Sequence, residues 1–146
     1  MPLAYYRPAA GTSYEIVAQG AEKKYMILAA AYVFGNKILD VAFKNAIIDG
    51  FVATNIGCQW SPGPESASII YNGTCPGSSA RRLLSDFVAY SAWNDSHLEI
   101  GWMSMIDGYH PELLMGAMKK MVKLRSKNKP QSRDDPCHHA KFYHDN

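Results

Sequence analysis

The chain has 146 residues, of which 47% are hydrophobic and 19% are charged, so it is long enough for one domain with a single core and is not disordered throughout. Its net charge of +2 conceals a basic C-terminal end, because residues 111–146 carry eight basic and four acidic side chains. Three cysteines without a CxxC pair argue against a disulfide-stapled secreted protein and favour an intracellular one, nuclear or cytoplasmic.

The first half of the chain predicts an extended lead-in followed by a helical hairpin. Residues 1–20 contain two prolines and two glycines, which favour extended structure. The hairpin runs from Leu28 to Ile56, and its first helix is apolar on nearly every side, as is typical of a helix enclosed by neighbours. The unbroken apolar run from Met26 to Phe34 is far shorter than the ~20 residues that span a bilayer, so we expect no membrane contact.

Local signals place the ends of these two helices. Gly35 and Asn36 tolerate the left-handed conformation and should end the first, while Asp40 should cap the second. Lys44, Asn45 and Asp49 should face outward from the second helix. Its spacing predicts a buried stripe of Phe43, Ala46, Ile47, Gly50 and Phe51.

Three further helices are expected after a Gly/Pro-rich connection at residues 57–64. The first, over 65–71, is short, with Ser61 or Gly63 as its cap. The second, over 79–93, should be capped by Ser78 or Ser79, with Arg81, Arg82, Ser85 and Asp86 outside and with these residues buried: Ala80, Leu83, Leu84, Phe87, Val88 and Ser91. After a covering loop with one helical turn, the third should start at Pro111 and bury Leu114, Ala117, Met118, Met121 and Val122.

Together these elements predict an all-α fold, a single helical bundle of about five helices without a strong strand signal. We expect the helical domain to span 21–125, after the lead-in at 1–20. Residues 126–146 should form a flexible, basic tail that contains cysteine and histidine.

A succession of short motifs resembles the C-terminal helical region of fungal BTB/POZ-domain proteins. The motifs are AYVFGNK (31–37), FKNAIIDGF (43–51), IIYNGT (69–74), SARRLLSDFVAY (79–90), YHPELLMGAMKKMVKLR (109–125), DPC (135–137) and YH (143–144). In that family a preceding α/β BTB fold supplies the dimerisation surface and, in some members, the contact with a cullin scaffold. Residues 1–24 are too few to hold this fold, so we expect a chain without the BTB core itself.

The resemblance implies a non-catalytic protein–protein interaction or scaffold module that binds a protein partner or a second copy of itself. Without a BTB fold over the first helix, an apolar face around Met26, Ile27, Ala30 and Phe34 would be left for association. Trp60 and Trp102 are further candidates, because aromatic side chains with a polar group favour interfaces.

The tail contains the residues best suited to a metal. Cys137, His139 and His144 could supply three zinc ligands, with Cys58 or Cys75 as a distant fourth. No second close pair completes the usual spacing, however. The alternative is a tail that packs Cys137 and Phe142 on the helical body, and we expect no cofactor.

Two other classes of function are weighed against the interaction module. A basic patch of Lys119, Lys120, Lys123, Arg125 and Lys127 could contact nucleic-acid phosphates. Part of this run is the outer face of an amphipathic helix and it has no interleaved aromatics, so nucleic acid is the weaker hypothesis. An unrecognised enzyme is weaker still, since GxSxG, HExxH, P-loop and GxGxxG motifs are all missing, and we name no catalytic residue.

Overall fold

The computed structural model describes residues 14–125 and 134–146. Within these ranges the chain is helical and contains no strand, which confirms the all-α fold. The elements in chain order are α1 (Tyr14–Lys37), α2 (Val41–Cys58), α3 (Pro64–Gly73), α4 (Ser79–Ser91), α5 (Trp102–Met105), the 3₁₀ turn η2 (Ile106–Gly108), α6 (Pro111–Arg125), η4 (Pro136–His138) and η5 (Ala140–Tyr143).

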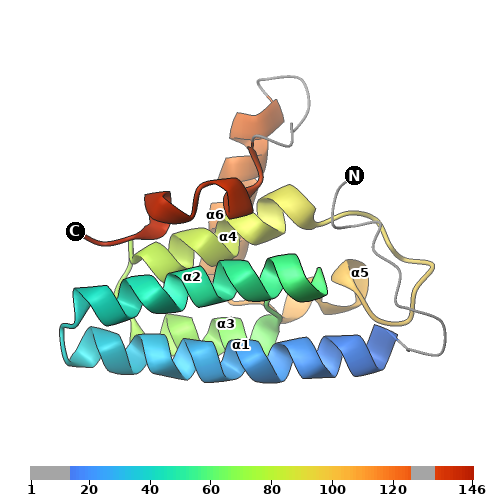
Figure 1. The fold of residues 1–146 in the computed structure, drawn as a ribbon. Helices are drawn as coiled ribbons and strands as arrows, with labels where there is room; N and C mark the ends of the chain where they lie inside the picture. Colours follow the sequence, from blue (N-terminus) through green and yellow to red (C-terminus); the bar gives the residue numbers. More distant parts are fainter. Residues whose placement is uncertain (1–13, 126–133) are drawn as a thin grey trace.

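Helices α1 and α2 form an antiparallel hairpin, with α3 packed on α1 and α4 packed on α6 (Figure 1). The short turns η4 and η5 lie on α2 and α4. The core between these helices is built from large side chains that are almost fully buried, among them Tyr25, Tyr32, Ile48, Phe51, Ile70, Leu83, Phe87 and Leu113.

Helix α1 is longer at both ends than the sequence suggested. It begins at Tyr14, which corrects the expected extended lead-in for residues 14–20, while residues 1–13 lie outside the described part of the chain. Gly20 is the one lead-in glycine within the helix, and a single glycine is tolerated there. The helix also continues past Gly35 to Lys37, so Gly35 does not end it. Asp40 caps α2 as predicted, because its Oδ1 accepts a hydrogen bond from the Phe43 N–H at 2.9 Å.

The buried side of α2 agrees with the expected stripe only in part: Phe51 is buried and Ile47 packs against the core. The buried residues are Ile48, Phe51, Val52 and Asn55, whereas Phe43 and Ala46 are exposed. The stripe is rotated because α2 packs against α1 on one side and against the C-terminal segment on another. That segment also covers Asn45 and Lys44, which were expected to face outward.

Helix α4 buries all six residues that its spacing predicted, and Ser78 caps it by accepting from the Arg81 N–H at 3.3 Å. Arg81 and Ser85, expected outside, are buried as well. Arg81 donates to Glu112 Oε2 at 2.6 Å and to the Tyr71 carbonyl at 3.0 Å, so α3 and α6 enclose this face of α4. The predicted outer face of α4 is therefore only partly open.

Helix α6 starts at Pro111 as predicted, but its expected buried side is only partly correct. Ala117 is buried and Leu114 and Met121 pack against the core, as expected, whereas Met118 and Val122 are exposed. Leu113 and Leu124, which were not expected in the core, are buried. The physical reason is that α6 packs on α4 along a single stripe, while its other side has no covering helix in the described structure.

The segment 134–146 packs on the helical body, which corrects the expectation of a flexible tail for these residues and confirms the alternative in which Cys137 packs there. The Tyr143 side chain is buried, and its hydroxyl donates to Asp86 Oδ2 at 2.7 Å. Asp145 accepts from Lys44 Nζ at 2.8 Å and from Ser79 Oγ at 2.7 Å, so it joins α2 to α4. Tyr143 is the aromatic anchor instead of Phe142, which is exposed.

Candidate interaction surface

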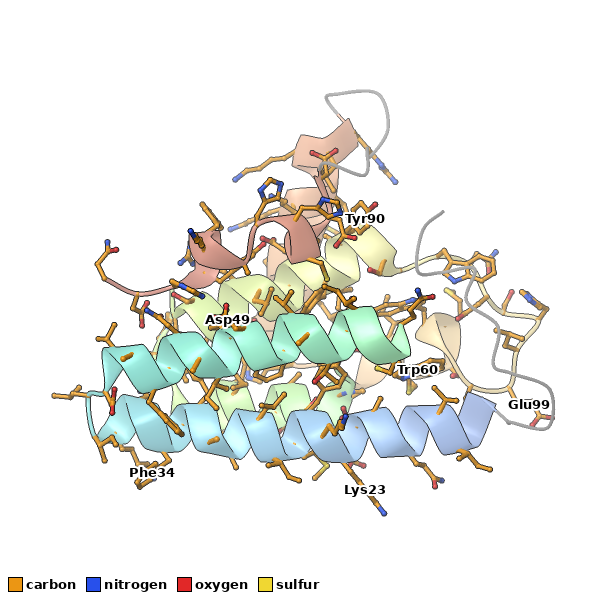
Figure 2. The ribbon with its side chains drawn as sticks, in the orientation of Figure 1. Lys23, Phe34, Asp49, Trp60, Tyr90 and Glu99 are labelled. Carbon is orange, nitrogen blue, oxygen red and sulfur yellow. The ribbon has the colours of Figure 1, made fainter. Side chains whose placement is uncertain are left out.

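Large apolar side chains are exposed along α1 and at the α1–α2 corner. Leu39 is 82% exposed, Ile27 is 70% exposed and Phe34 is 57% exposed. Figure 2 shows Phe34 at the corner end of α1, at the edge of the molecule. We define the hairpin patch as the exposed apolar residues of α1, the corner and the start of α2, namely Ile27, Ala30, Phe34, Ile38, Leu39 and Phe43.

Helical spacing and one glycine bring these residues together. Ile27, Ala30 and Phe34 recur at i, i+3 and i+7 and therefore share one face of α1. The Phe34 and Phe43 rings meet edge to face, with 6.4 Å between their centroids. A Cβ added at Gly35 would lie 2.7 Å from Phe43 Cδ1, so the Phe43 ring occupies the space that glycine leaves open.

The corner between the helices has the hydrogen bonds of a Schellman motif. Asp40 N–H donates to the Gly35 carbonyl at 3.0 Å, and Leu39 N–H donates to the Asn36 carbonyl at 3.3 Å. This motif requires a left-handed residue at the position after the helix cap, which is usually glycine. Here that residue is Leu39, with a φ of 57°.

Leu39 is therefore unfavourable in two ways. A left-handed backbone costs an L-residue with a large side chain roughly 1–2 kcal/mol. The side chain recovers little of this by burial, since 82% of it is exposed. Backbone strain of this kind concentrates at functional sites, which makes the exposed Leu39 a candidate binding residue.

A cavity of about 730 Å³ lies between α1, the start of α3 and the α5–η2 segment. Its walls include Met26 and Trp60, two residues that the sequence placed at an interface. Glu22 also lines it and serves as the cap of α3: its carboxylate accepts from the Gly63 N–H and the Ser66 N–H, each at 2.9 Å. Gly63 occupies the expected cap position but has no side chain, so the acceptor comes from another helix.

The structure thus divides the six interaction residues predicted from the sequence. Ile27, Ala30 and Phe34 lie in the hairpin patch, and Met26 and Trp60 line the cavity. Trp102 is half-buried against the core, and its backbone N–H donates to Asp95 Oδ2 at 2.8 Å. Ile38, Leu39 and Phe43 were not predicted as interaction residues. The adjacent aliphatic residues Ile38 and Leu39, in the short connection between two predicted helices, were a signal of exposed apolar surface.

The three proposed metal ligands do not lie together around a common site. Cys137 Sγ lies 3.2 Å from Asn55 Oδ1, His144 Nε2 lies 2.6 Å from Asp49 Oδ1, and His139 is exposed. Burial, with a smaller contribution from Asp135, raises the pKa of the Cys137 thiol to about 12, which disfavours the thiolate that binds metal. Across residues 14–125 and 134–146 there is no group of three His, Cys, Asp or Glu side chains that could hold an ion.

The basic residues lie on the outer side of α6. Lys119, Lys123 and Arg125 are exposed and Lys120 is half-buried, while Lys127 falls outside the described residues. Exposed methionines lie on the same helix, so the basic patch borders an apolar surface.

Comparisons with models of protein families, with curated proteins and with solved structures gave no match for this chain. None of the helices in the described ranges is long and apolar enough to cross a membrane. The chemistry of its own surface is therefore the main guide to function. On that surface the hairpin patch combines the greatest apolar exposure with a strained backbone.

Proposed function

We propose that the protein is a non-catalytic protein–protein interaction or scaffold module that binds its partner through the hairpin patch. The observation that carries this proposal is Leu39, a large apolar side chain held in a left-handed backbone and left 82% exposed. A partner that buries Leu39 supplies the contact that the isolated chain does not provide.

The patch offers enough apolar surface to anchor an interface. Full burial of a Leu, Ile or Phe side chain contributes roughly 1.5–3 kcal/mol. The five large side chains of the patch are partly to mostly exposed. The free energy gained by burying them is comparable with the roughly 4–15 kcal/mol that association costs in translational and rotational freedom. The exposed Lys23 and Lys37 flank the patch and provide a polar rim.

The resemblance to the helical region of fungal BTB/POZ proteins supports the same proposal. In those proteins this region follows a BTB fold, so a face of its first helix would be covered by more protein. The exposed Ile27, Ala30 and Phe34 lie on such a face here. The resemblance therefore favours this face of α1 as the one that binds other protein.

The test is affinity purification of the tagged protein from cell extract, with bound proteins quantified by mass spectrometry, and light scattering across a range of concentrations for self-association. We expect Phe34→Asp to abolish a specific interaction and Ile56→Asp to preserve it. Ile56 is the matched control, because it is also 57% exposed and lies on α2 outside the patch. A monomer without a specific partner, or equal loss in both variants, would contradict the proposal.

A further inference from the structure

Helix α6 carries a second exposed apolar surface, separate from the hairpin patch. Met115, Met118 and Val122 are between 56% and 62% exposed, and we call them the α6 stripe. They recur at i, i+3 and i+7, so they share one face of the helix. The opposite face, with Leu113, Ala117 and Leu124, is buried, so the helix is fixed with this stripe outward.

The α6 stripe is bordered by positive charge. Lys119 and Lys123 are exposed and lie about a quarter turn from it, and Arg125 stands at its C-terminal end. Glu112 is the single acidic residue of the helix, and its carboxylate is paired with Arg81 at 2.6 Å. The open side of α6 is therefore amphipathic, with an apolar centre and a basic edge.

We propose that the α6 stripe binds an acidic amphipathic helix of a partner protein. A helix with apolar residues at i, i+3 or i+4 and i+7 matches the spacing of the stripe. Its glutamates or aspartates would meet Lys119 and Arg125, which gives charge complementarity. Methionine suits such a surface, because its flexible thioether adapts to different apolar partners.

The chemistry of the α6 stripe argues against three other binding partners: a second copy of the chain, a membrane and nucleic acid. A second copy would bring either its own α6 lysines or the hairpin patch with Lys23 and Lys37, so like charges would meet. Helices that lie on membranes carry Trp, Phe or Leu on their apolar face, whereas the α6 stripe consists of two methionines and a valine. Nucleic-acid phosphates would pair with the lysines but would leave the methionines exposed.

The test uses two fluorescein-labelled synthetic helical peptides of about 18 residues, or about five turns. Both carry the same leucine stripe, with glutamate at the remaining positions in one and lysine in the other. Fluorescence anisotropy with the full chain should show binding of the acidic peptide alone, weakening as salt increases. Lys119→Glu and Met118→Ser should each weaken it about tenfold, as expected for the loss of one good contact.

Lys24→Glu is the matched control, because it makes the same charge change at an exposed lysine of α1 and should leave peptide binding unchanged. Lys119→Gln, which removes the charge without reversing it, replaces Lys119→Glu if that variant loses its helical circular dichroism. Failure of the acidic peptide to bind, equal binding of both peptides, or equal weakening by Lys24→Glu would overturn the proposal. So would binding confined to phosphatidylserine vesicles or to DNA. Phe34→Asp, which tests the hairpin patch, should not affect this assay.

Discussion

Replacing Leu39 with asparagine should make the protein more stable and, at the same time, weaken its interaction. Leu39 occupies the left-handed position of the α1–α2 corner with a φ of 57°. Asparagine enters this region more readily than leucine, because its short polar side chain can bond to the local backbone. The substitution therefore relieves strain and removes the most exposed apolar side chain of the hairpin patch.

The magnitude follows from two opposing terms. Relief of the left-handed strain should gain about 1 kcal/mol of unfolding free energy, the lower part of the range for an L-residue. Because Leu39 is 82% exposed, the burial lost is about a fifth of that of a full leucine, or roughly 0.4 kcal/mol. The net gain is about 0.5 kcal/mol, which corresponds to a rise in Tm of about 2 °C.

Urea unfolding followed by circular dichroism measures this gain, provided that the denaturant slope stays constant. Ile56→Asn is the matched control: Ile56 is also an exposed aliphatic residue, but it lies within α2, where asparagine should cost a few tenths of a kcal/mol. If Leu39→Asn lowers the unfolding free energy by about 1 kcal/mol or more, Leu39 makes contacts that stabilise the fold and the strain argument fails.

Three further predictions concern contacts that hold the fold together outside the hairpin patch. Glu22→Ala should lower the unfolding free energy by about 2–3 kcal/mol, because α3 loses its cap and buried donors are left unpaired; a loss below about 0.5 kcal/mol in urea unfolding would contradict this. In iodoacetamide labelling read by mass spectrometry, the exposed Cys75 should react in the folded protein and Cys137 only after unfolding, since burial raises the pKa of Cys137 to about 12. The hydrogen bond from Lys44 holds the pKa of Asp145 below its ordinary value of 3.8, so Asp145 should stabilise the fold at higher pH and lose this effect as pH falls through its folded pKa. Between pH 6 and pH 3 the unfolding free energy should fall less for Asp145→Asn than for the wild type. An equal fall would refute this role of Asp145.

The elements set by local sequence were predictable. Asp40, Ser78 and Pro111 begin helices as expected, because each acts on backbone groups within its own first turn. The buried face of α4 was also correct, since its apolar residues repeat with the helical period.

Features that depend on distant parts of the chain were not predictable. Glu22 caps a helix that starts more than 40 residues later, and no local pattern marks it. Arg81 was expected on an open face and is instead buried beneath α3 and α6, where its hydrogen bonds compensate for its charge. The packing of segment 134–146 on α2 and α4 rests on contacts such as that of Asp145 with Lys44, and these cross most of the chain.

The candidate surface was predictable in part. The sequence proposed the face of α1 with Ile27, Ala30 and Phe34, because the first helix has more apolar surface than the chain can cover. Leu39 was missed because Gly35 and Asn36 adopt the left-handed conformation more readily, so the end of the helix was predicted at those two residues. Gly35 instead lies within α1, buried against the Phe43 ring of α2, and no local pattern marks this contact between two helices.

Photo-crosslinking from position 39 tests the role of the hairpin patch most directly. The chain is expressed in cells with a benzoylphenylalanine in place of Leu39 and, separately, in place of Ile56, and adducts are resolved by mass after irradiation. Both sites are exposed, so neither substitution should disturb the core. We expect a discrete adduct from position 39, with a second copy or one specific protein, and none from position 56. No adduct at position 39, or the same adducts from both positions, would contradict a role of the hairpin patch in binding.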